Sequence, residues 1–283
     1  KKNTVDVQDA YTNNYTDYLD TIPHLFWYNA FLILSNGLEA KVGTLGSKYE
    51  FFHEWKRLSE QETGSVALET MLRGICKKEN FLDLLENFIL FDHSGGRTAK
   101  ILARNHQYLG VNEAVKAYEA RKLNNGKLGV FWHTQGSGKS YSMVFLAQKI
   151  RRKFAGSPTI VILTDRDELN KQISDTFENC GLLGKTKASQ FIATSGEDLV
   201  QKLKGNPSFI FTLIQKFNKA NPEPIYPDHD ILIMSDEAHR SQYGIFADNM
   251  TVLLPTASRI GFTGTPLLSN DNITERTFGG YIS

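Results

Sequence analysis

The chain has 283 residues, of which 41% are hydrophobic and 22% charged, and its 32 basic and 31 acidic side chains give a formal net charge of +1. This length allows one large domain or two moderate ones, and the composition is that of an ordinary globular protein. The near-neutral charge excludes an excess of positive charge over the whole chain, so any nucleic-acid contact must come from a local basic surface. No apolar run reaches the length of a membrane span, and the first residues lack the apolar stretch of a signal peptide. We therefore expect a cytoplasmic protein with no membrane partner.

The first part of the chain, up to about residue 90, mixes aromatic and apolar clusters with loop residues. A mostly apolar run over 22–34 leads into a turn at Ser35-Asn36-Gly37. The segment 66–90 is predicted to be helical, because its apolar residues recur at roughly helical intervals. Those residues are Leu68, Leu72, Ile75, Leu82, Leu85 and Ile89. The character of the chain then changes, and we place a domain boundary there, between 1–90 and 91–283.

Beyond that boundary, short apolar runs of strand length alternate with helical stretches. The predicted strands are 129–132, 159–163, 209–214, 231–234 and 260–262, and a helix is predicted over 141–154. Strands this uniformly apolar are typical of a parallel sheet that is buried on both faces. The sequence therefore predicts a three-layer α/β domain of the RecA type with a mainly parallel sheet.

A glycine-rich loop follows the first of these strands and opens the helix. Its sequence is His133-Thr134-Gln135-Gly136-Ser137-Gly138-Lys139-Ser140. Backbone N–H groups of such a loop, together with the helix N-terminus, favour phosphate binding. Lys139 is expected to reach the β- and γ-phosphates of ATP, and the Ser140 hydroxyl to bind Mg²⁺. His133 stands where the P-loop pattern has its first glycine, which leaves a chance match open for this motif alone. The predicted ATP-binding residues of the loop are Thr134, Gly136, Ser137, Gly138, Lys139 and Ser140.

An acidic motif, Asp236-Glu237-Ala238-His239, follows the apolar run 231–234. A carboxylate at the end of a buried parallel strand lies at the sheet edge where the P-loop also lies. We expect Asp236 to hold the Mg²⁺ and Glu237 to orient and polarise the attacking water, with Lys139 as the third catalytic residue. The alternative, a solvated Asp-Glu turn, loses weight because a P-loop lies upstream. The two motifs together indicate an ATPase.

The acidic motif and Gly261-Phe262-Thr263-Gly264-Thr265-Pro266 look like motifs II and III of superfamily-two helicases and translocases. Together with the P-loop they resemble the R (HsdR) subunit of type I restriction–modification enzymes. The resemblance extends over nearly the whole chain. It includes Ile22-Pro23, Leu25-Phe26, Ser35-Asn36-Gly37, Phe52, Trp55-Lys56, Phe88 to Phe91, Phe278-Gly279 and Tyr281. It implies an ATP-dependent double-stranded DNA translocase and DNA cleavage subunit that works with methyltransferase (M) and specificity (S) subunits.

The resemblance also gives roles to residues outside the two ATPase motifs. Gln107, in a Q-type element ahead of the P-loop, is expected to pair with the adenine edge, although a polar position on an amphipathic helix remains an alternative. Elements that look like motifs Ia and Ib are expected to line the DNA track, where backbone contacts position the strand without reading sequence. Taken alone, Arg166 and Lys216 would read as solvated surface charges. The expected track and coupling residues are Thr164, Arg166, Gln215, Lys216, His239, Thr263, Gly264 and Thr265.

Residues 1–90 resemble the C-terminal part of an α/β nuclease domain of the PD-(D/E)xK kind and its join to the first motor lobe. Its catalytic carboxylates, and a second lobe carrying arginine fingers, would lie outside this chain. The nearest match to the Q-x-x-x-Y element of such nucleases is Asn14 with Tyr18, where Asn replaces Gln. An ordinary amphipathic helix with an exposed Asn14 and a packed Tyr18 is an equal alternative.

Two other functions stay open at this point. One is a different superfamily-two motor, such as a type III restriction motor or a repair helicase, against which the N-terminal block argues. The other is a non-catalytic DNA-binding module with a relic ATP site. The intact Lys139, Ser140, Asp236 and Glu237 argue against such decay, and nucleotide binding would separate the two.

Overall fold

The computed structural model describes residues 5–132, 134, 136–218, 222–236, 243–264 and 272–282. The chain forms two compact units, Lys1–Leu109 and Gly110–Ser283. Helix α5 (Asn105–Glu119) begins in the first unit and continues into the second. Among the described residues, no helix is both long enough and apolar enough to cross a bilayer.

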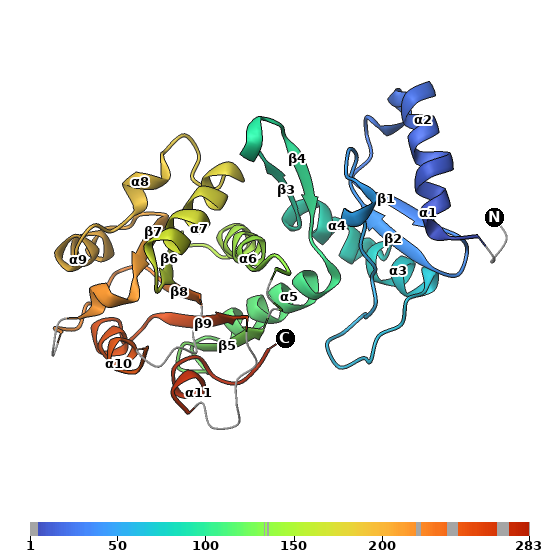
Figure 1. The fold of residues 1–283 in the computed structure, drawn as a ribbon. Coiled ribbons are helices and arrows are strands. Elements are labelled where there is room, and N and C mark those ends of the chain that lie inside the picture. Colours follow the sequence, from blue (N-terminus) through green and yellow to red (C-terminus); the bar gives the residue numbers. More distant parts are fainter. Residues whose placement is uncertain are drawn as a thin grey trace. The chain divides into compact units, whose positions relative to one another are not determined.

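The first unit combines short helices with two antiparallel hairpins (Figure 1). In one hairpin Leu32 lies opposite Gly43, and in the other Ile89 lies opposite Leu102. The Asn36 side chain closes the first turn, because its Oδ1 accepts from the backbone N–H groups of Leu38 and Glu39. The helices are α1 (Val7–Ala10), α2 (Thr16–Thr21), α3 (Leu68–Ile75) and α4 (Lys78–Asn87), and the strands are β1 (Leu32–Ser35), β2 (Ala40–Gly43), β3 (Ile89–Asp92) and β4 (Ala99–Leu102). Single helical turns of other types cover Tyr11–Tyr15, Pro23–Phe26, Tyr49–Phe51 and Ser94–Gly96.

The prediction of one helical segment over 66–90 is wrong. The helix stops at Ile75, because Lys77 takes an extended backbone conformation before α4 begins. Ile89 belongs to β3, where pairing with β4 replaces the helical hydrogen bonds. Leu72 and Leu82 are exposed, so the apolar spacing does not mark a single buried stripe.

Aromatic rings form much of the core of the first unit. Tyr15 packs edge-on against Phe26, and Tyr11 packs against Phe52, with ring centroids 5.5 and 5.7 Å apart. Such tilted pairs stabilise a core beyond the area that they bury. A second cluster holds the fully buried Trp55, whose ring centroid lies 5.3 Å from that of Tyr108.

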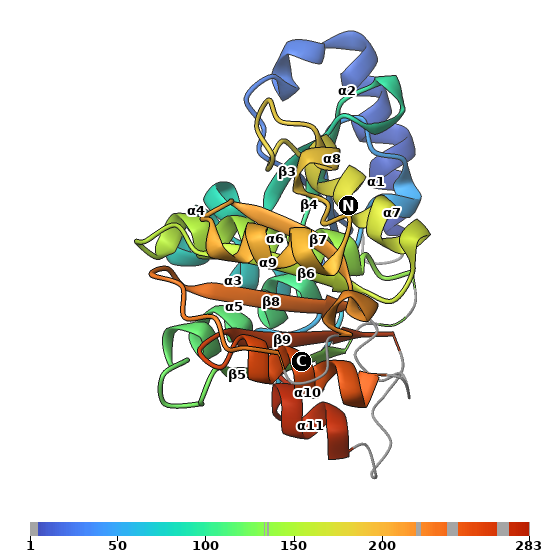
Figure 2. The same ribbon diagram turned by 90° about the vertical axis from the view of Figure 1, so that its left-hand side faces the viewer.

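The second unit is built on a five-stranded, all-parallel sheet in the order β5-β9-β8-β6-β7 (Figure 2). Three of the strands are buried along their whole length, as the continuous apolar runs predict. The strands are β5 (Lys127–Trp132), β6 (Thr159–Thr164), β7 (Phe209–Leu213), β8 (Ile231–Asp236) and β9 (Ser258–Thr263). The helices are α6 (Lys139–Lys153), α7 (Asp167–Asn179), α8 (Ala188–Phe191), α9 (Gly196–Lys204), α10 (Tyr243–Leu253) and α11 (Asn272–Phe278), with a 3-10 turn over Ile214–Phe217.

Helices cover both faces of this sheet. Phe177 of α7 packs edge-on against Phe209 and Phe211 of β7, whose side chains point to one face. Ile210, between them, joins the opposite core with residues of α9, α10 and α11. Alternate residues of a strand face opposite sides, so the sheet is the middle of three layers. The predicted three-layer α/β architecture is confirmed.

Candidate nucleotide and DNA site

The carboxyl ends of β5, β9 and β8 lie side by side in the sheet. Trp132, the last residue of β5, pairs with Thr263 of β9, and Phe262 pairs in turn with Asp236 of β8. In an open parallel sheet, ligands bind beyond this edge of the strands. The register therefore brings the P-loop and the acidic motif to one edge, with β9 between them.

The P-loop curls through two glycines in the left-handed region. Gly136 has φ +80° and Gly138 has φ +92°, a conformation that side chains with a Cβ rarely adopt. The Ser137 N–H donates to the Thr134 carbonyl at 3.0 Å and closes the turn. His133 and Gln135 lie outside the described residues. The loop ends at the helix, with Gly138 as its N-cap.

Helix α6 begins at Lys139, so Lys139 and Ser140 stand in its first turn. Gly138, as the N-cap, has no side chain with which to satisfy the first N–H groups of the helix. Space around Gly136 is open, because a Cβ built there would meet no atom within 4 Å. A helix start without a side-chain cap, with a cation in its first turn, suits an anion such as phosphate.

The charged groups of the two motifs are in direct contact. The Lys139 Nζ lies 2.6 Å from Asp236 Oδ1. The Asp236 side chain is fully buried, whereas that of Lys139 is 20% exposed. A buried carboxylate requires a partner of opposite charge, and Lys139 provides it. The P-loop lysine therefore faces the carboxylate that the sequence assigns to the metal.

The donor set fits Mg²⁺ and a nucleotide phosphate. Mg²⁺ takes oxygen ligands and usually needs only one or two from the protein beside those of phosphate and water. Asp236 offers a carboxylate at the strand end, and Ser140 a hydroxyl in the first turn of α6. Lys139 offers a cation that can serve the carboxylate or a phosphate. Glu237, assigned to the attacking water, lies outside the described residues.

The loops after β6 and β7 are tied together by a residue from each predicted DNA motif. The Gln215 Nε2 donates to the Asp165 carbonyl at 2.9 Å. Thr164 is buried at the end of β6, and its hydroxyl donates weakly to the Arg166 carbonyl at 3.4 Å. The Arg166 side chain is 61% exposed, 3.7 Å from the Asp165 carboxylate. Three of the predicted track residues therefore lie together at the carboxyl ends of adjacent strands.

The other predicted track residues differ in exposure. Lys216 is half-buried and its ammonium donates to the Ala193 carbonyl, so it is not a freely solvated surface charge. Thr263 is fully buried at the end of β9, and Gly264 follows it, half-buried. His239 and Thr265 lie outside the described residues.

Gln107 is buried near the start of α5. Its Oε1 accepts from the Arg104 backbone N–H at 2.8 Å, which closes the first turn of that helix. This contact engages the amide oxygen in the first unit. The sequence analysis assigned Gln107 to adenine and missed this capping bond. A Gln three residues after the N-cap is the sequence pattern that usually indicates such a bond.

Asn14 and Tyr18 lie one helical turn apart and line the same hollow. Their exposure is the reverse of the amphipathic-helix alternative, because Asn14 is half-buried and Tyr18 is 47% exposed. The hollow has a volume of 300 Å³, and its wall includes Tyr15 and Phe26. The two residues therefore share one surface of the first unit.

A model of the SWI2/SNF2 ATPase family matches residues 106–283, which is more than half of the chain. The chain belongs to the SWI2/SNF2 ATPase family. That match spans the P-loop, the acidic motif and all five strands of the sheet. The family assignment agrees with the superfamily-two motifs that the sequence shows.

Curated relatives resemble the whole chain. The type I restriction enzyme HindI endonuclease subunit of Haemophilus influenzae is 37% identical over 100% of this chain and 29% of its own length. The type I restriction enzyme SsaAORF53P endonuclease subunit of Staphylococcus saprophyticus is 25% identical over 94% of this chain and 28% of its own. The chain thus spans less than a third of the length of these relatives. The resemblance to type I R subunits is confirmed.

A solved structure supports the fold. The UvsW helicase from bacteriophage T4 superimposes with a TM-score of 0.50 at 16% identity, covering 83% of this chain and 80% of the helicase chain. At this identity the likeness concerns the fold alone. The RecA-like arrangement predicted from the strand pattern is therefore confirmed.

Proposed function

We propose that this chain supplies the ATP-binding first motor lobe of a type I restriction enzyme R subunit that translocates and cleaves double-stranded DNA. The observation that carries the proposal is the Lys139–Asp236 contact at the carboxyl edge of the RecA-like sheet. The names of the full-chain relatives support the restriction role. The nuclease carboxylates and a second lobe are assigned to other parts of the full protein, because the chain spans less than a third of those relatives.

In this proposal the lysine changes partner when nucleotide binds. Without nucleotide, the ammonium of Lys139 neutralises the buried Asp236. With nucleotide, Lys139 would turn toward the β- and γ-phosphates, and Asp236 and Ser140 would hold Mg²⁺. Mg²⁺, when bound there, would compensate the negative charge of the phosphates. Glu237 orients and polarises the attacking water, and Gln107 is the proposed contact to adenine.

The DNA path runs along the loops that follow β6 and β7. Arg166 presents an exposed guanidinium there, and the Gln215 bond to Asp165 holds the two loops together. Phosphate contacts of this kind position the strand without reading its sequence. Recognition of sequence is assigned to the S subunit, with the M subunit as the third component. Thr263 and Gly264, at the end of β9, couple this path to the ATP site, and His239 and Thr265 are proposed to share that role.

The proposal assigns the first 90 residues to the end of a nuclease domain. The relatives named as endonuclease subunits support this assignment. Asn14 and Tyr18, which line one hollow, are its proposed nuclease-associated residues.

The test is steady-state ATP hydrolysis by the full-length protein with and without duplex DNA. We expect DNA to stimulate hydrolysis, and K139A to abolish it. K153A is the matched control, because Lys153 lies at the end of the same helix in an exposed pair with Glu119 and stands outside the proposed site. Hydrolysis by K139A at the rate of K153A would refute the ATP-site assignment. An ATP hydrolysis rate that is the same with and without duplex DNA would refute the motor assignment.

A further inference from the structure

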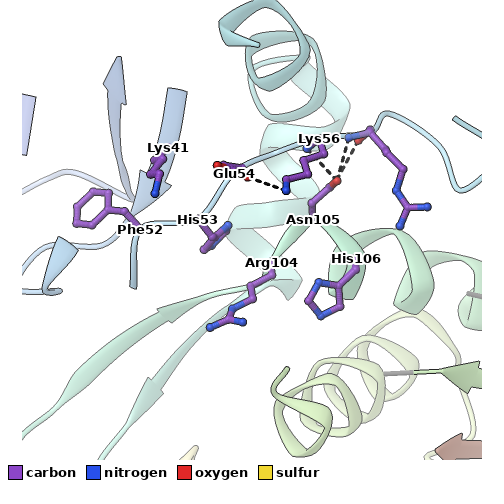
Figure 3. Close-up of a pocket in the computed structure, with 9 residues that line it drawn as sticks. Lys41, Phe52, His53, Glu54, Lys56, Arg104, Asn105 and His106 are labelled. Atoms are coloured by element: carbon purple, nitrogen blue, oxygen red, sulfur yellow. Dashed lines mark hydrogen bonds and ion pairs between the residues drawn. The ribbon is translucent and has the colours of Figure 1, made fainter. Parts of the chain in front are cut away.

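The first unit contains a cleft lined mainly by basic side chains, which we call the basic cleft. Its cations are Lys41, Lys56, Arg57 and Arg104, and its volume is 420 Å³. Figure 3 shows Lys41, Lys56 and Arg104 around the cleft, with His53 between Lys41 and Arg104. The predicted ATP and DNA residues do not include any of these cations.

Positive charge dominates the lining. Glu54 is its one carboxylate among the described residues, and it pairs with Lys56 at 2.8 Å. Arg57 is 3.2 Å from Glu60. Arg104 is exposed and forms no ion pair with any described residue, while Lys41 lies over the Tyr49 ring at 4.8 Å. The cleft therefore holds more cationic charge than its own acids neutralise.

The pKa of the buried His53, which lines the cleft, is consistent with this positive potential. Both of its ring nitrogens are shielded from solvent. Burial, and after it the positive charges of Arg104 and His106, together lower the pKa of His53 to about 3. His53 is therefore neutral at physiological pH and leaves the charge of the cleft to the lysines and arginines.

The backbone that carries two of these cations is held in place. Asn105 is buried, and its Oδ1 accepts from the N–H groups of Lys56 and Arg57 at 3.1 and 3.0 Å. Its Nδ2 donates to the Arg57 carbonyl at 2.9 Å. Asn105 follows Arg104 directly, so one side chain fixes the Lys56–Arg57 segment beside Arg104. A site whose backbone is already fixed loses less entropy when it binds a ligand.

We propose that the basic cleft binds phosphate groups of the DNA backbone. The inference rests on the proposed function, because DNA is the polyanion which that function supplies. Flexible cations on an open surface suit phosphate contacts, which position a protein on DNA. A free nucleotide fits less well, because the one Phe of the lining, Phe52, is only 3% exposed and offers no ring for a base to stack on. An acidic protein segment is the remaining alternative, and the test separates it.

The test compares salt dependence of DNA binding by the full-length protein. The variant K41Q/K56Q/R104Q removes three cleft cations and leaves polar, uncharged side chains in their place. The matched control K48Q/R73Q/K77Q removes three cations of the same unit that are 65–80% exposed and lie outside the cleft. Fluorescence anisotropy with a duplex oligonucleotide is measured from about 50 to about 200 mM salt, because log K falls by about 0.9 per phosphate contact for each tenfold rise in salt.

We expect the cleft variant to bind DNA about tenfold more weakly at about 100 mM salt, with a salt slope reduced by about 1 or more, while the control keeps the wild-type slope. Arg104 is exposed and forms no ion pair within the described part of the chain, so the single variant R104Q should lower the slope in the same direction.

Equal slopes for the cleft variant and the control would overturn the proposal. So would loss of Mg-ATP binding with the slope unchanged, which would make the cleft a nucleotide site. Weaker assembly with the M and S subunits at an unchanged slope would make it a protein-docking site and would also overturn it. If the unaltered protein binds no duplex DNA, the proposed function fails and the cleft assignment fails with it.

Discussion

Replacing Lys139 by alanine should destabilise the nucleotide-free protein as well as abolish ATP hydrolysis. In the structure the Lys139 ammonium is 2.6 Å from the carboxylate of Asp236, which has no exposed side-chain surface. The substitution leaves that carboxylate buried without its cation. The expected effect is therefore larger than for a lysine whose only role is to meet a ligand.

The magnitude follows from the burial of the pair. Removing one partner of a buried ion pair typically costs about 3–5 kcal/mol. We expect a loss of about 3 kcal/mol, at the lower end of that range, because the Lys139 side chain keeps 20% exposure and part of the interaction is screened. Adding D236N to K139A removes the unpaired buried carboxylate charge and should restore about 2 kcal/mol of the lost free energy of unfolding.

The assay is chemical denaturation of the nucleotide-free wild type, K139A, D236N and the double variant, which together form a double-mutant cycle. K153A again serves as the matched control, because both partners of its Lys153–Glu119 pair are exposed. Its stability should change by less than about 1 kcal/mol. If D236N destabilises K139A as much as it destabilises the wild type, the two side chains do not interact and the reasoning fails.

Three further predictions concern hydrolysis, pH and the isolated chain. E237Q should bind Mg-ATP yet block hydrolysis, since an amide cannot polarise water as a carboxylate does; turnover at the wild-type rate would place the base elsewhere. The pKa of His53 is lowered from 6.5 to about 3, so the unfolded chain binds more protons between those values and stability is lost as the pH falls below 6.5. Because of this group, the free energy of unfolding at about pH 5 should be about 2 kcal/mol lower than at about pH 8. The variant H53Q should lack this part of the pH dependence, and an unchanged pH dependence would contradict the burial of His53. The isolated 283-residue chain should hydrolyse ATP poorly, because an arginine finger from a second lobe is typically worth roughly 10³–10⁵ in rate; robust DNA-stimulated turnover would mean that the site is complete within this chain.

The sheet and the positions of the two motifs at its edge could be predicted from sequence because their signals are local. Strands buried on both faces read as continuous apolar runs, and β6 and β8 show this most clearly. The runs located the strands, although β8 extends to Asp236 and β9 begins at Ser258, two residues beyond the predicted end and start. The polar ends were missed because backbone pairing, rather than side-chain polarity, determines them.

The features that sequence did not reveal depend on contacts between distant residues. Ile89 fits a helical spacing, yet it forms a strand because β4 is available to pair with it. Lys41, Lys56 and Arg104 are far apart in the chain, and hydrogen bonds that the Asn105 side chain accepts from the Lys56–Arg57 backbone bring the last two together. The direct contact between Lys139 and Asp236 could not be read from either motif alone, because it requires the strand order that places β9 between them.

The most direct test of the central claim is translocation by the full-length protein assembled with the proposed M and S subunits, measured as displacement of a third strand from a DNA triplex. We predict displacement that requires ATP and Mg²⁺ with the unaltered protein and with K153A, and none with K139A. Displacement by K139A at the rate of K153A, or displacement without ATP, would contradict the assignment of this chain as the ATP-binding lobe of a DNA motor.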